Sequence, residues 1–428
     1  VAAAGYLKFA PPELLRVATN YSAKIVCSNV FIAGRDAHEV LAVDVQAPGH
    51  PLLKYISIDV DQEKQAVTAK LFQFIATATS QYRDGLGCTN IHSAQLSDAR
   101  LAAQNASSTG LWPQGNSVNL SQDLGLMKVL SDEALLGEGY RAALVIKNGR
   151  IVGERYAEGF DADTPLLGWS MTKTVTAALV GTLIRSSELS LTDTLTNSYP
   201  NWDGDGRKNV TVEAMLAMSS GLEWNEAYGN VSDVTRMLFL NDDMSGFASK
   251  FELEADIASV FQYSSGTSTM LARVWQDKVG EGSLAYPRDR IFSPLGMNSA
   301  VMETDANDTF VGSSYMYATA RDWGRFGQFL LQKGVWERQQ LLPTGFTEWM
   351  FEPVEVSNGR YTKGHLWREV KEGKPPLEDS VWMSGHDGQF VGVFPSRSMV
   401  VVRLGLTPSS LGYSPLPLAQ AVIGALED

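Results

Sequence analysis

A serine and a lysine stand three residues apart at the start of an apolar stretch, Ser170 and Lys173 in the segment GWSMTKTVTAALVGTLI. If this segment is helical, positions three apart lie on one face, so the two side chains can touch. A serine hydroxyl becomes a good nucleophile only when a neighbouring base accepts its proton. A neutral lysine can be that base if its pKa falls by roughly 3 pH units from about 10.4, a bias of about 4 kcal/mol. Burial and the positive end of the helix dipole both act in that direction.

The same two residues also have an ordinary structural interpretation, in which the serine caps a helix and the lysine lies along an apolar surface with its amine in solvent. Two later stretches favour the chemical interpretation. In FQYSSGTSTMLA, Tyr263 precedes Ser264 and Ser265 at the start of a helical pattern. In MSGHDGQFVGVFP, a glycine-rich turn from Gly385 to Gln389 separates two strand patterns.

In order and spacing, these three motifs resemble those of the serine β-lactamase and penicillin-binding superfamily. The stretches SMTKTVTAALVG, MLAMSSGLEWNEAY and GHDGQ are similar in particular to the class C-like branch, which includes family VIII carboxylesterases and 6-aminohexanoate-dimer hydrolases. The resemblance covers the chain from about residue 118 to the C-terminus. It implies a β-lactamase-like fold and acyl transfer through a serine, with no metal or organic cofactor.

The resemblance implies a role for each motif residue. Ser170 is the nucleophile that becomes acylated, Lys173 is its base, and Tyr263 passes a proton to the leaving group. A phenol beside a cationic lysine is expected to be partly ionised, which suits that transfer. Ser265 stands where the β-lactamase pattern has an asparagine, so it is a candidate for contact with the substrate.

Two backbone N–H groups are expected to hold the oxyanion, one from Ser170 and one from the strand that leads into the glycine-rich turn. If Met383-Ser384-Gly385 takes the place of the superfamily's Lys-Thr-Gly triplet, the second donor is His386. If His386-Asp387-Gly388 takes that place, the second donor is Gln389.

The chain contains no Lys-Thr-Gly, whose lysine helps β-lactam-acting enzymes hold the substrate carboxylate. The corresponding residue is Met383 or His386, which disfavours a β-lactamase and favours an esterase or amidase. Tyr228, in the loop EWNEAYGN, is comparable to a tyrosine that faces the substrate amide in 6-aminohexanoate-dimer hydrolases, with surface packing as the alternative. A Ser-His-Asp triad through His386 is a rival interpretation, but the sequence around Ser170 lacks the second glycine of a nucleophile elbow.

A sheet and helices must position these motifs. ALVIKNGRIVGERYAEG has two apolar runs around Asn148-Gly149, which indicates a tight hairpin, and SVWMSGHDGQFVGVFPSRSMVVVRLG is typical of two or three further strands. Residues from about 186 to 290 are mostly helical and loop-like. We therefore expect an α/β fold of the α+β type over residues 118–428, in which an antiparallel sheet flanked by helices carries a mostly helical lobe.

Residues 1–115 form a separate N-terminal region. KIVCSNVFIAG and LKYISIDVDQEKQAVTAKLF predict short strands, so the region is expected to hold mixed short strands. The segment 105–117, rich in Ser, Gly, Asn and Pro, is the candidate linker. Cys27 and Cys88 are the only cysteines. Either they are two unrelated buried thiols or they form one disulfide, which would indicate a periplasmic or secreted protein.

Composition narrows the class of partner. The 428-residue chain has a formal net charge of −13 and no basic patch, so we expect a small-molecule substrate rather than nucleic acid. No uncharged apolar run reaches about 18 residues, the length typical of a membrane span. Five histidines without ligand-like spacing disfavour a zinc site.

The sequence thus predicts a periplasmic or secreted serine hydrolase that cleaves carboxylic esters or linear amides. One alternative is a D-amino-acid peptidase or weak β-lactamase of the same fold. The other is a binding module that keeps the fold without turnover.

Overall fold

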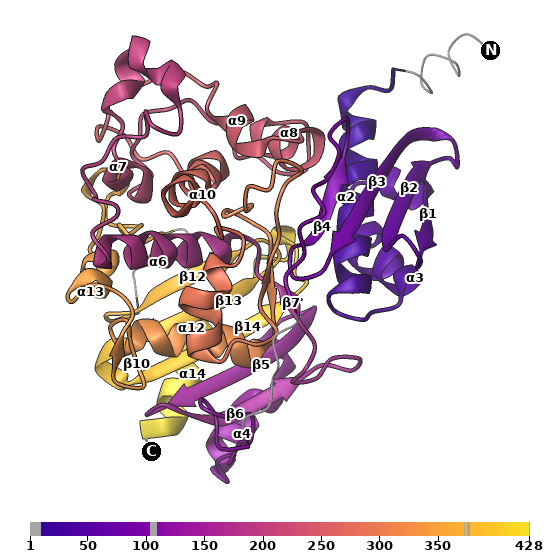
Figure 1. Cartoon of the computed structure of the whole chain (residues 1–428). Helices are drawn as coiled ribbons and strands as arrows, with labels where there is room; N and C mark the ends of the chain where they lie inside the picture. The colour runs from indigo at the N-terminus through magenta and orange to yellow at the C-terminus, as the bar shows by residue number, and fades with distance from the viewer. Residues whose placement is uncertain (1–9, 103–108, 372, 375–376, 428) are drawn as a thin grey trace.

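A five-stranded antiparallel sheet forms the centre of the molecule in the computed structural model of the chain (Figure 1). The structure describes residues 10–102, 109–371, 373–374 and 377–427. The strand order is β12-β13-β14-β5-β6, which confirms the expected antiparallel sheet. These strands are β5 (Tyr140–Lys147), β6 (Arg150–Tyr156), β12 (Val381–Gly385), β13 (Gln389–Phe394) and β14 (Met399–Gly405).

The hairpin expected around Asn148 and Gly149 is confirmed and joins β5 to β6. Both turn residues have a positive φ, 50° at Asn148 and 74° at Gly149. Asn-Gly adopts that conformation readily, and the resulting turn matches the right-handed twist of the two strands.

Helices cover both faces of this sheet, which explains why six consecutive residues of β5 are buried. Ala142 and Leu144 belong to the core cluster on the side of α12, whereas Ala143 and Val145 pack with α4 and α14 on the other face. Helix α6 lies between the sheet and α10 (Figure 1). These helices are α4 (Leu124–Ser131), α6 (Thr172–Arg185), α12 (Ala320–Leu331) and α14 (Leu416–Glu427).

The range of about 186–290, expected to be the helical lobe, holds short helices joined by loops, with one longer helix, α10. The helices are α7 (Val212–Leu216), α8 (Asp233–Leu240), α9 (Met244–Ala248) and α10 (Ser265–Val279), with 3-10 turns at η4 (Pro200–Gly204) and η5 (Gly206–Asn209). The N-terminus of α10 is capped by Ser264, whose hydroxyl accepts a hydrogen bond from the N–H of Thr267 at 3.0 Å. This cap fixes the start of the helix at Ser265, so that Tyr263 directly precedes the capping residue.

Several short elements complete this part of the chain. They are α5 (Glu133–Leu136), α11 (Ser293–Leu295), α13 (Phe346–Phe351), β7 (Leu166–Leu167), β8 (Val301–Met302), β9 (Met316–Ala318), β10 (Val335–Trp336) and β11 (Gln339–Gln340). Strands β7, β9 and β8 form a small sheet in that order, and the chain leaves β7 directly toward Ser170.

The N-terminal region packs one long helix against a four-stranded antiparallel meander of order β1-β2-β3-β4, drawn in indigo and violet in Figure 1. The strand pair expected in LKYISIDVDQEKQAVTAKLF is confirmed as β1 and β2. The elements are α2 (Glu13–Phe31), α3 (Ala37–Val40), η2 (Pro51–Tyr55), β1 (Ile56–Asp61), β2 (Ala66–Leu71), β3 (Ile75–Arg83) and β4 (Gly87–Ile91).

The strand expected in KIVCSNVFIAG is wrong, because the chain stays helical in α2 as far as Phe31. Thr19, Ser22, Ala23 and Val26 are all fully buried and recur at spacings of three and four residues, which is the pattern of a helix face. The short stretch that suggested a strand contains β-branched residues, which favour strands locally. Burial of one face of the longer helix outweighs that local preference.

The candidate linker is only partly described, because residues 105–108 lie outside the described ranges. The part that is described packs against α12. Trp112 is buried, and Arg325 of α12 donates hydrogen bonds to the carbonyls of Pro113 and Gly115 at 3.0 and 2.8 Å. Residues 112–115 are therefore held on the larger part of the chain rather than free between two parts.

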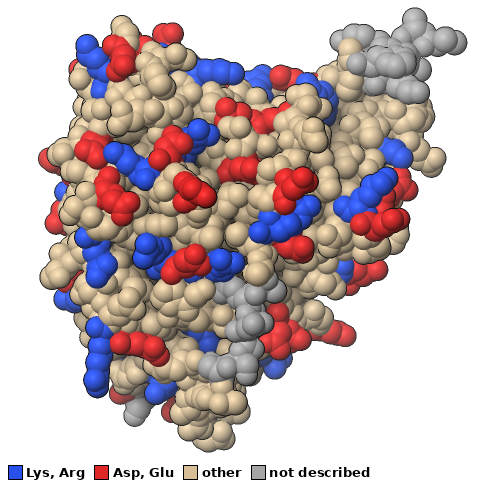
Figure 2. Space-filling model, in the orientation of Figure 1, with Lys and Arg blue, Asp and Glu red and all other residues tan. Residues whose placement is uncertain are grey.

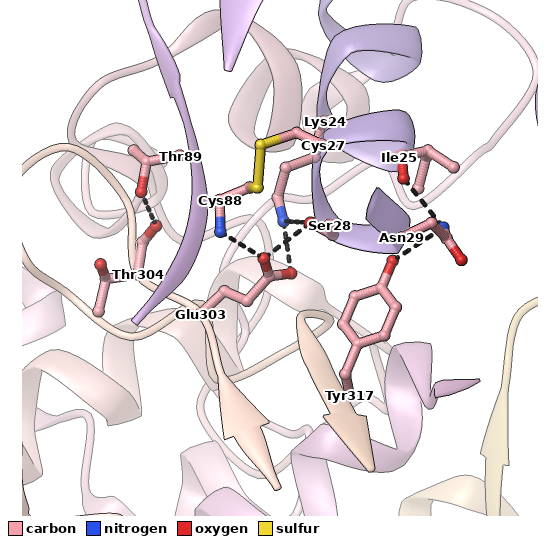
Figure 3. The surroundings of a disulfide bond; sticks show 10 residues. All are labelled: Lys24, Ile25, Cys27, Ser28, Asn29, Cys88, Thr89, Glu303, Thr304 and Tyr317. Carbon is pink, nitrogen blue, oxygen red and sulfur yellow. Dashed lines mark hydrogen bonds and ion pairs between the residues drawn. A yellow bond between two sulfur atoms is a disulfide. The ribbon is translucent and has the colours of Figure 1, made fainter. Parts of the chain in front are cut away.

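A buried carboxylate helps to join the N-terminal region to the rest of the molecule (Figure 3). A disulfide links Cys27 of α2 to Cys88 of β4, as one of the two sequence-based alternatives predicted. Beside it, Glu303, which follows β8, forms a buried ion pair with Lys24. The same carboxylate accepts hydrogen bonds from the Ser28 hydroxyl at 2.8 Å and the Cys88 N–H at 2.7 Å.

Asp44 forms a second buried connection. It accepts two hydrogen bonds from Arg35 at 2.7 and 3.0 Å and two from Arg141 of β5 at 2.8 and 2.7 Å. Burial alone would raise the pKa of Asp44, but the hydrogen bonds from Arg141 and Arg35 leave that pKa below its ordinary value. The carboxylate therefore stays charged and ties the N-terminal region to the central sheet.

The surface carries charges of both signs. Figure 2 shows Lys and Arg side chains interspersed with Asp and Glu on the visible face rather than gathered in one patch. Within the described ranges, no helix combines the length and the apolar composition needed to cross a bilayer.

We expect Glu303→Gln to lower the free energy of unfolding by about 3–5 kcal/mol, the range for removing one partner of a buried ion pair. The reason is that Lys24 would stay buried without a carboxylate beside it. Urea unfolding at pH 7 measures this loss.

Glu13→Gln is the control, because Glu13 pairs with Arg236 at 3.0 Å on the surface, with both side chains more than a third exposed. Exposed pairs of this kind contribute about 1 kcal/mol or less. Equal losses in the two variants would contradict the anchoring role of Glu303.

Candidate active site

Ser170 lies in a single 3-10 turn, η3 (Trp169–Met171), between β7 and α6. Trp169 has a φ of 48°, a left-handed conformation that is rare for a bulky residue and is typically retained where a backbone must turn sharply at a functional site. Gly168 has no room for a side chain, since a Cβ there would lie 2.2 Å from the ring of Trp323. The turn presents Ser170 half-buried, with access from outside.

Lys173 stands in the first turn of α6 and is only 1% exposed. Its Nζ lies 3.0 Å from Oγ of Ser170, 2.9 Å from Oγ of Ser265 and 3.0 Å from the carbonyl oxygen of Ser313. Burial lowers the pKa of Lys173 to about 8, even though the negative charge of Glu226 acts in the opposite direction. A minor but accessible fraction of the amine is therefore neutral at pH 7, and this fraction can accept a proton.

The hydrogen-bond partners of Lys173 determine which part of the neutral amine faces Ser170. A neutral amine has two N–H bonds and one lone pair. The Ser313 carbonyl can only accept, so it takes one N–H. Oγ of Ser265 donates its own proton to Glu226 at 2.6 Å, so it can only accept from Lys173, and it accepts the second N–H of the amine. The lone pair is left for the hydroxyl proton of Ser170, which is the arrangement that a general base requires.

Glu226 is the residue that sequence reasoning missed. Its carboxylate accepts hydrogen bonds from the hydroxyl and the N–H of Ser265 at 2.6 and 2.8 Å and from the indole N–H of Trp224 at 2.6 Å. The signal in the sequence was an acidic residue two positions before Tyr228 in EWNEAYGN. That loop has no periodicity from which its contact with the start of α10 could be inferred.

Tyr263 is half-buried beside the lysine, with Nζ of Lys173 4.8 Å from the centre of its ring. Burial, followed by the negative charge of Glu226, raises the pKa of Tyr263, and a hydrogen bond with Ser170 lowers it only in part. The expectation of a partly ionised phenol is therefore wrong. Because burial and Glu226 outweigh the other influences, the phenol keeps its proton and is a donor.

The glycine-rich turn lies against the start of η3. A Cβ added to Gly385 would be 2.2 Å from the carbonyl oxygen of Gly168, so β12 can approach the Ser170 turn only because this residue is glycine. Within the described part of the chain, no hydrogen bond uses the N–H of His386, the next residue. This N–H is thus free to bind an oxyanion.

The structure separates the two possible positions of the Lys-Thr-Gly equivalent. Met383-Ser384-Gly385 lies on β12, whereas residues 386–388 form the turn between β12 and β13. The side chain of Gln389 is buried and donates to the carbonyls of His386, Asp387 and Gly405 at 3.1, 3.0 and 2.6 Å. Gln389 thus shapes the turn from inside, and its side chain is not available to a substrate.

Met383 is fully buried in the same core cluster as Trp169 and Met171. The side chain of Met383 is therefore not available to a substrate. The hydroxyl of Ser265, the residue expected to replace an asparagine of β-lactam-acting enzymes, already makes hydrogen bonds with Lys173 and Glu226.

Tyr228 and His386 form an aromatic group with Trp169. The rings of Tyr228 and His386 are stacked with centres 4.8 Å apart, and the Trp169 ring meets His386 edge-on at 5.6 Å. Burial raises the pKa of Tyr228 well above its ordinary value, so the phenol stays protonated. His386 faces its neighbour Asp387 at 3.3 Å. Across the described residues it makes no hydrogen bond to Ser170, so the structure does not form the rival Ser-His-Asp triad.

A family model described as Beta-lactamase matches residues 139–410. The chain belongs to the beta-lactamase family. The match covers every motif residue from Ser170 to Gln389, and the antiparallel sheet with its helices is the fold that the resemblance implied. The family comprises serine hydrolases, among them esterases and amide hydrolases.

Individual relatives are distant in sequence. A 6-aminohexanoate-dimer hydrolase of Paenarthrobacter ureafaciens is 23% identical over 221 residues, which is 48% of this chain and 56% of that protein, so the match spans little more than half of the relative. A Bacillus anthracis structure provisionally assigned as a 6-aminohexanoate-dimer hydrolase has a TM-score of 0.61 at 23% identity, over 76% of this chain and 87% of its own. A family VIII carboxylesterase has a TM-score of 0.54 at 14% identity, over 72% and 99%. At these identities the structures show a shared fold.

If Lys173 is the base, kcat/KM should rise with pH along a limb centred at about 8, because the amine must be neutral. The charge of Glu226 stabilises the protonated lysine, so Glu226→Gln should lower the pKa of Lys173. We expect the limb to move to lower pH by roughly one unit, the smallest shift typical of a nearby opposite charge. The pH dependence of kcat/KM with a p-nitrophenyl ester measures it.

Glu223→Gln is the control, since Glu223 is an exposed carboxylate in the same loop. It should leave the limb where it is. If Glu226→Gln lowered the rate without moving the limb, Glu226 would have a structural role only and the proposed coupling to Lys173 would be wrong.

Proposed function

We propose that this protein is a serine hydrolase that cleaves carboxylic esters or linear amides through an acyl-enzyme on Ser170. The observation that carries the proposal is the pair of Ser170 and Lys173, 3.0 Å apart, with the amine buried and its pKa lowered to about 8. A lysine with no chemical role would gain by keeping its charge in solvent, since burial of an amine is unfavourable.

Acylation moves one proton through the site. Oγ of Ser170 attacks the substrate carbonyl while its proton passes to the lone pair of Lys173. The negative charge on the carbonyl oxygen is held by the N–H groups of Ser170 and His386. When the bond to the leaving group breaks, Tyr263 gives that group a proton and recovers one from Lys173, which returns to its neutral state.

Deacylation repeats these steps with water as the nucleophile. Lys173 takes a proton from the water as the water oxygen bonds to the acyl carbon. The ester bond to Ser170 then breaks, and Oγ takes that proton back from Lys173. The acid product leaves, and the site is restored. The whole cycle uses groups of the protein and one water molecule.

Two features favour an ester or linear amide over a β-lactam. Met383 is apolar and buried where a lysine would hold a substrate carboxylate, and Ser265 is engaged by Glu226. The relative from Paenarthrobacter ureafaciens is named as hydrolysing the 6-aminohexanoate dimer, which supports a linear amide as one substrate class. Tyr228, stacked on His386, is the proposed contact for such an amide.

The alternatives predict other outcomes. A D-amino-acid peptidase or weak β-lactamase would use the same three residues on a different substrate, and a binding module would show no turnover. The disulfide between Cys27 and Cys88 favours an oxidising compartment, so we place the protein in the periplasm or outside the cell.

Ser170→Ala should abolish labelling by a fluorophosphonate probe and reduce ester hydrolysis by at least about a thousandfold, because loss of a nucleophile in a coupled unit typically removes more than that. Intact-mass spectrometry of the probe adduct and a p-nitrophenyl butyrate assay measure the two effects. A wild-type protein that takes up no probe would support the binding module instead.

We expect p-nitrophenyl butyrate to be hydrolysed with a higher kcat/KM than nitrocefin. A charged hydrogen bond to a substrate carboxylate contributes about 1.5–3 kcal/mol, or roughly 10- to 150-fold in binding, and buried Met383 cannot supply it. Nitrocefin turned over as fast as the ester would favour the β-lactamase alternative. A linear amide dimer as the best substrate, lost selectively in Tyr228→Phe, would favour the amidase.

A further inference from the structure

A cavity of about 350 Å³ lies where the N-terminal region meets the candidate active site. Trp169, Tyr228 and His386 line it on one side, and these are the three aromatic side chains grouped next to Ser170. The other side is formed by α2 and by the segment 48–53. Ser170 itself does not line the cavity, which adjoins the site through Trp169, the chain neighbour of Ser170, and through His386.

Helix α2 contributes an apolar stripe to this cavity. Leu14, Val17, Ala18 and Tyr21 all line it, and they recur at spacings of three, one and three residues, so they lie on one face of the helix. The ring of Tyr21 meets that of Phe239 from α8 edge-on at 5.6 Å, which joins the two walls.

The segment 48–53, which forms the wall opposite the aromatic group, is tightly packed. A Cβ on Gly49 would lie 2.3 Å from the side chain of Leu53 and 2.4 Å from the carbonyl oxygen of Val45, so the chain is tightly packed there. Leu52 and Leu53 then line the cavity from the 3-10 turn η2. None of this wall lies within residues 139–410, which match the family, so it is a feature of this chain's N-terminal region.

Charge limits what the cavity can hold. Among the described residues that line it there is no lysine or arginine, and Asp387 is the only carboxylate. An anionic group would find no cationic partner there and would meet this acidic residue. The contents are therefore expected to be neutral. His50, Asn230, Thr235, Ser409 and Ser410 add uncharged polar groups to the wall, whereas the stripe of α2 with Leu52 and Leu53 favours an apolar chain on its side.

The position of Tyr263 indicates which part of a substrate enters the cavity. Tyr263 does not line the cavity, and its ring packs on the side of Trp367 and Tyr361, with centres 5.3 and 5.8 Å away. If Tyr263 protonates the leaving group, the leaving group lies on that side of Ser170. The acyl group then extends past His386 toward the cavity.

We infer that this cavity is the acyl subsite of the enzyme. It selects substrates whose acyl group is an apolar chain of medium length. This inference rests on the proposed function and adds a substrate class to it. An apolar cavity of about 150 Å³ holds a benzene molecule, so one more than twice as large accommodates on the order of ten carbon atoms. Each methylene group that becomes buried improves binding by about fourfold.

The test is a chain-length series on wild-type protein and on Ala18→Phe. Ala18 is half-buried on the apolar stripe, and a phenyl ring there would fill part of the cavity from the side of α2. For wild type, kcat/KM should rise at least tenfold from p-nitrophenyl acetate to p-nitrophenyl octanoate. In Ala18→Phe, the octanoate value should fall at least tenfold while the acetate value stays within about twofold.

Ala42→Phe is the matched control, because Ala42 is exposed in the same region and does not line the cavity. It should keep the wild-type chain-length profile. If Ala18→Phe does not fold, Leu52→Phe narrows the same cavity from the opposite wall and should give the same selective loss.

The outcomes separate the two proposals. Acetate hydrolysis that depends on Ser170 but a chain-length profile that neither cavity variant changes would overturn the acyl subsite and leave the hydrolase intact. No ester hydrolysis and no fluorophosphonate labelling would overturn the hydrolase itself. Equal losses on acetate and octanoate would show that the substitutions disturb the site as a whole, which contradicts a selective subsite.

Discussion

A lysine amine held out of water is the constraint on which the rest of the site depends. Burial makes the neutral form of Lys173 accessible near pH 8, but a buried amine must also have partners for its N–H groups. The Ser313 carbonyl and the Ser265 hydroxyl provide them, and Glu226 fixes the direction of the second by accepting the serine proton. The negative charge of Glu226 raises the pKa of Lys173, whereas desolvation lowers it. The two effects offset each other in part, so the lysine keeps both protonation states within reach near pH 8.

The backbone around Ser170 satisfies a second requirement, the close approach of η3 and β12. Gly168 is packed under Trp323 and Gly385 is packed against the carbonyl of Gly168, so neither position has room for a Cβ. Trp169, which follows Gly168, has a left-handed backbone conformation and turns the chain toward Ser170. This strained arrangement brings the N–H of His386 to the neighbourhood of the nucleophile, and the buried amide of Gln389 holds the turn that follows.

Sequence reasoning reached the parts of this molecule that local patterns encode. The Asn148-Gly149 hairpin needs only its own turn residues, and the motifs around Ser170, Tyr263 and the glycine-rich turn are contiguous. Glu226 and the Ser313 carbonyl are different, because each reaches Lys173 through a loop whose path depends on tertiary packing. Helix α2 was missed for a related reason, since its buried face is visible only over a window longer than the stretch with β-branched residues.

The position of the N-terminal region matters for chemistry as well as for stability. A wall supplied by a separate region can set the length of an acyl chain only if that wall does not move relative to Ser170. Glu303 anchors α2 and β4 together beside the disulfide (Figure 3), and Asp44 anchors the segment before the cavity wall to Arg141 of the central sheet. A third carboxylate, Asp242, accepts the backbone N–H groups of residues 92–94 after β4. Among the described residues, the partners of Lys173 are Ser170, Ser265 and Ser313 rather than any of these three carboxylates. Loss of the carboxylates would therefore loosen the cavity wall and weaken the selection among substrates before it changed the proton transfer at Ser170.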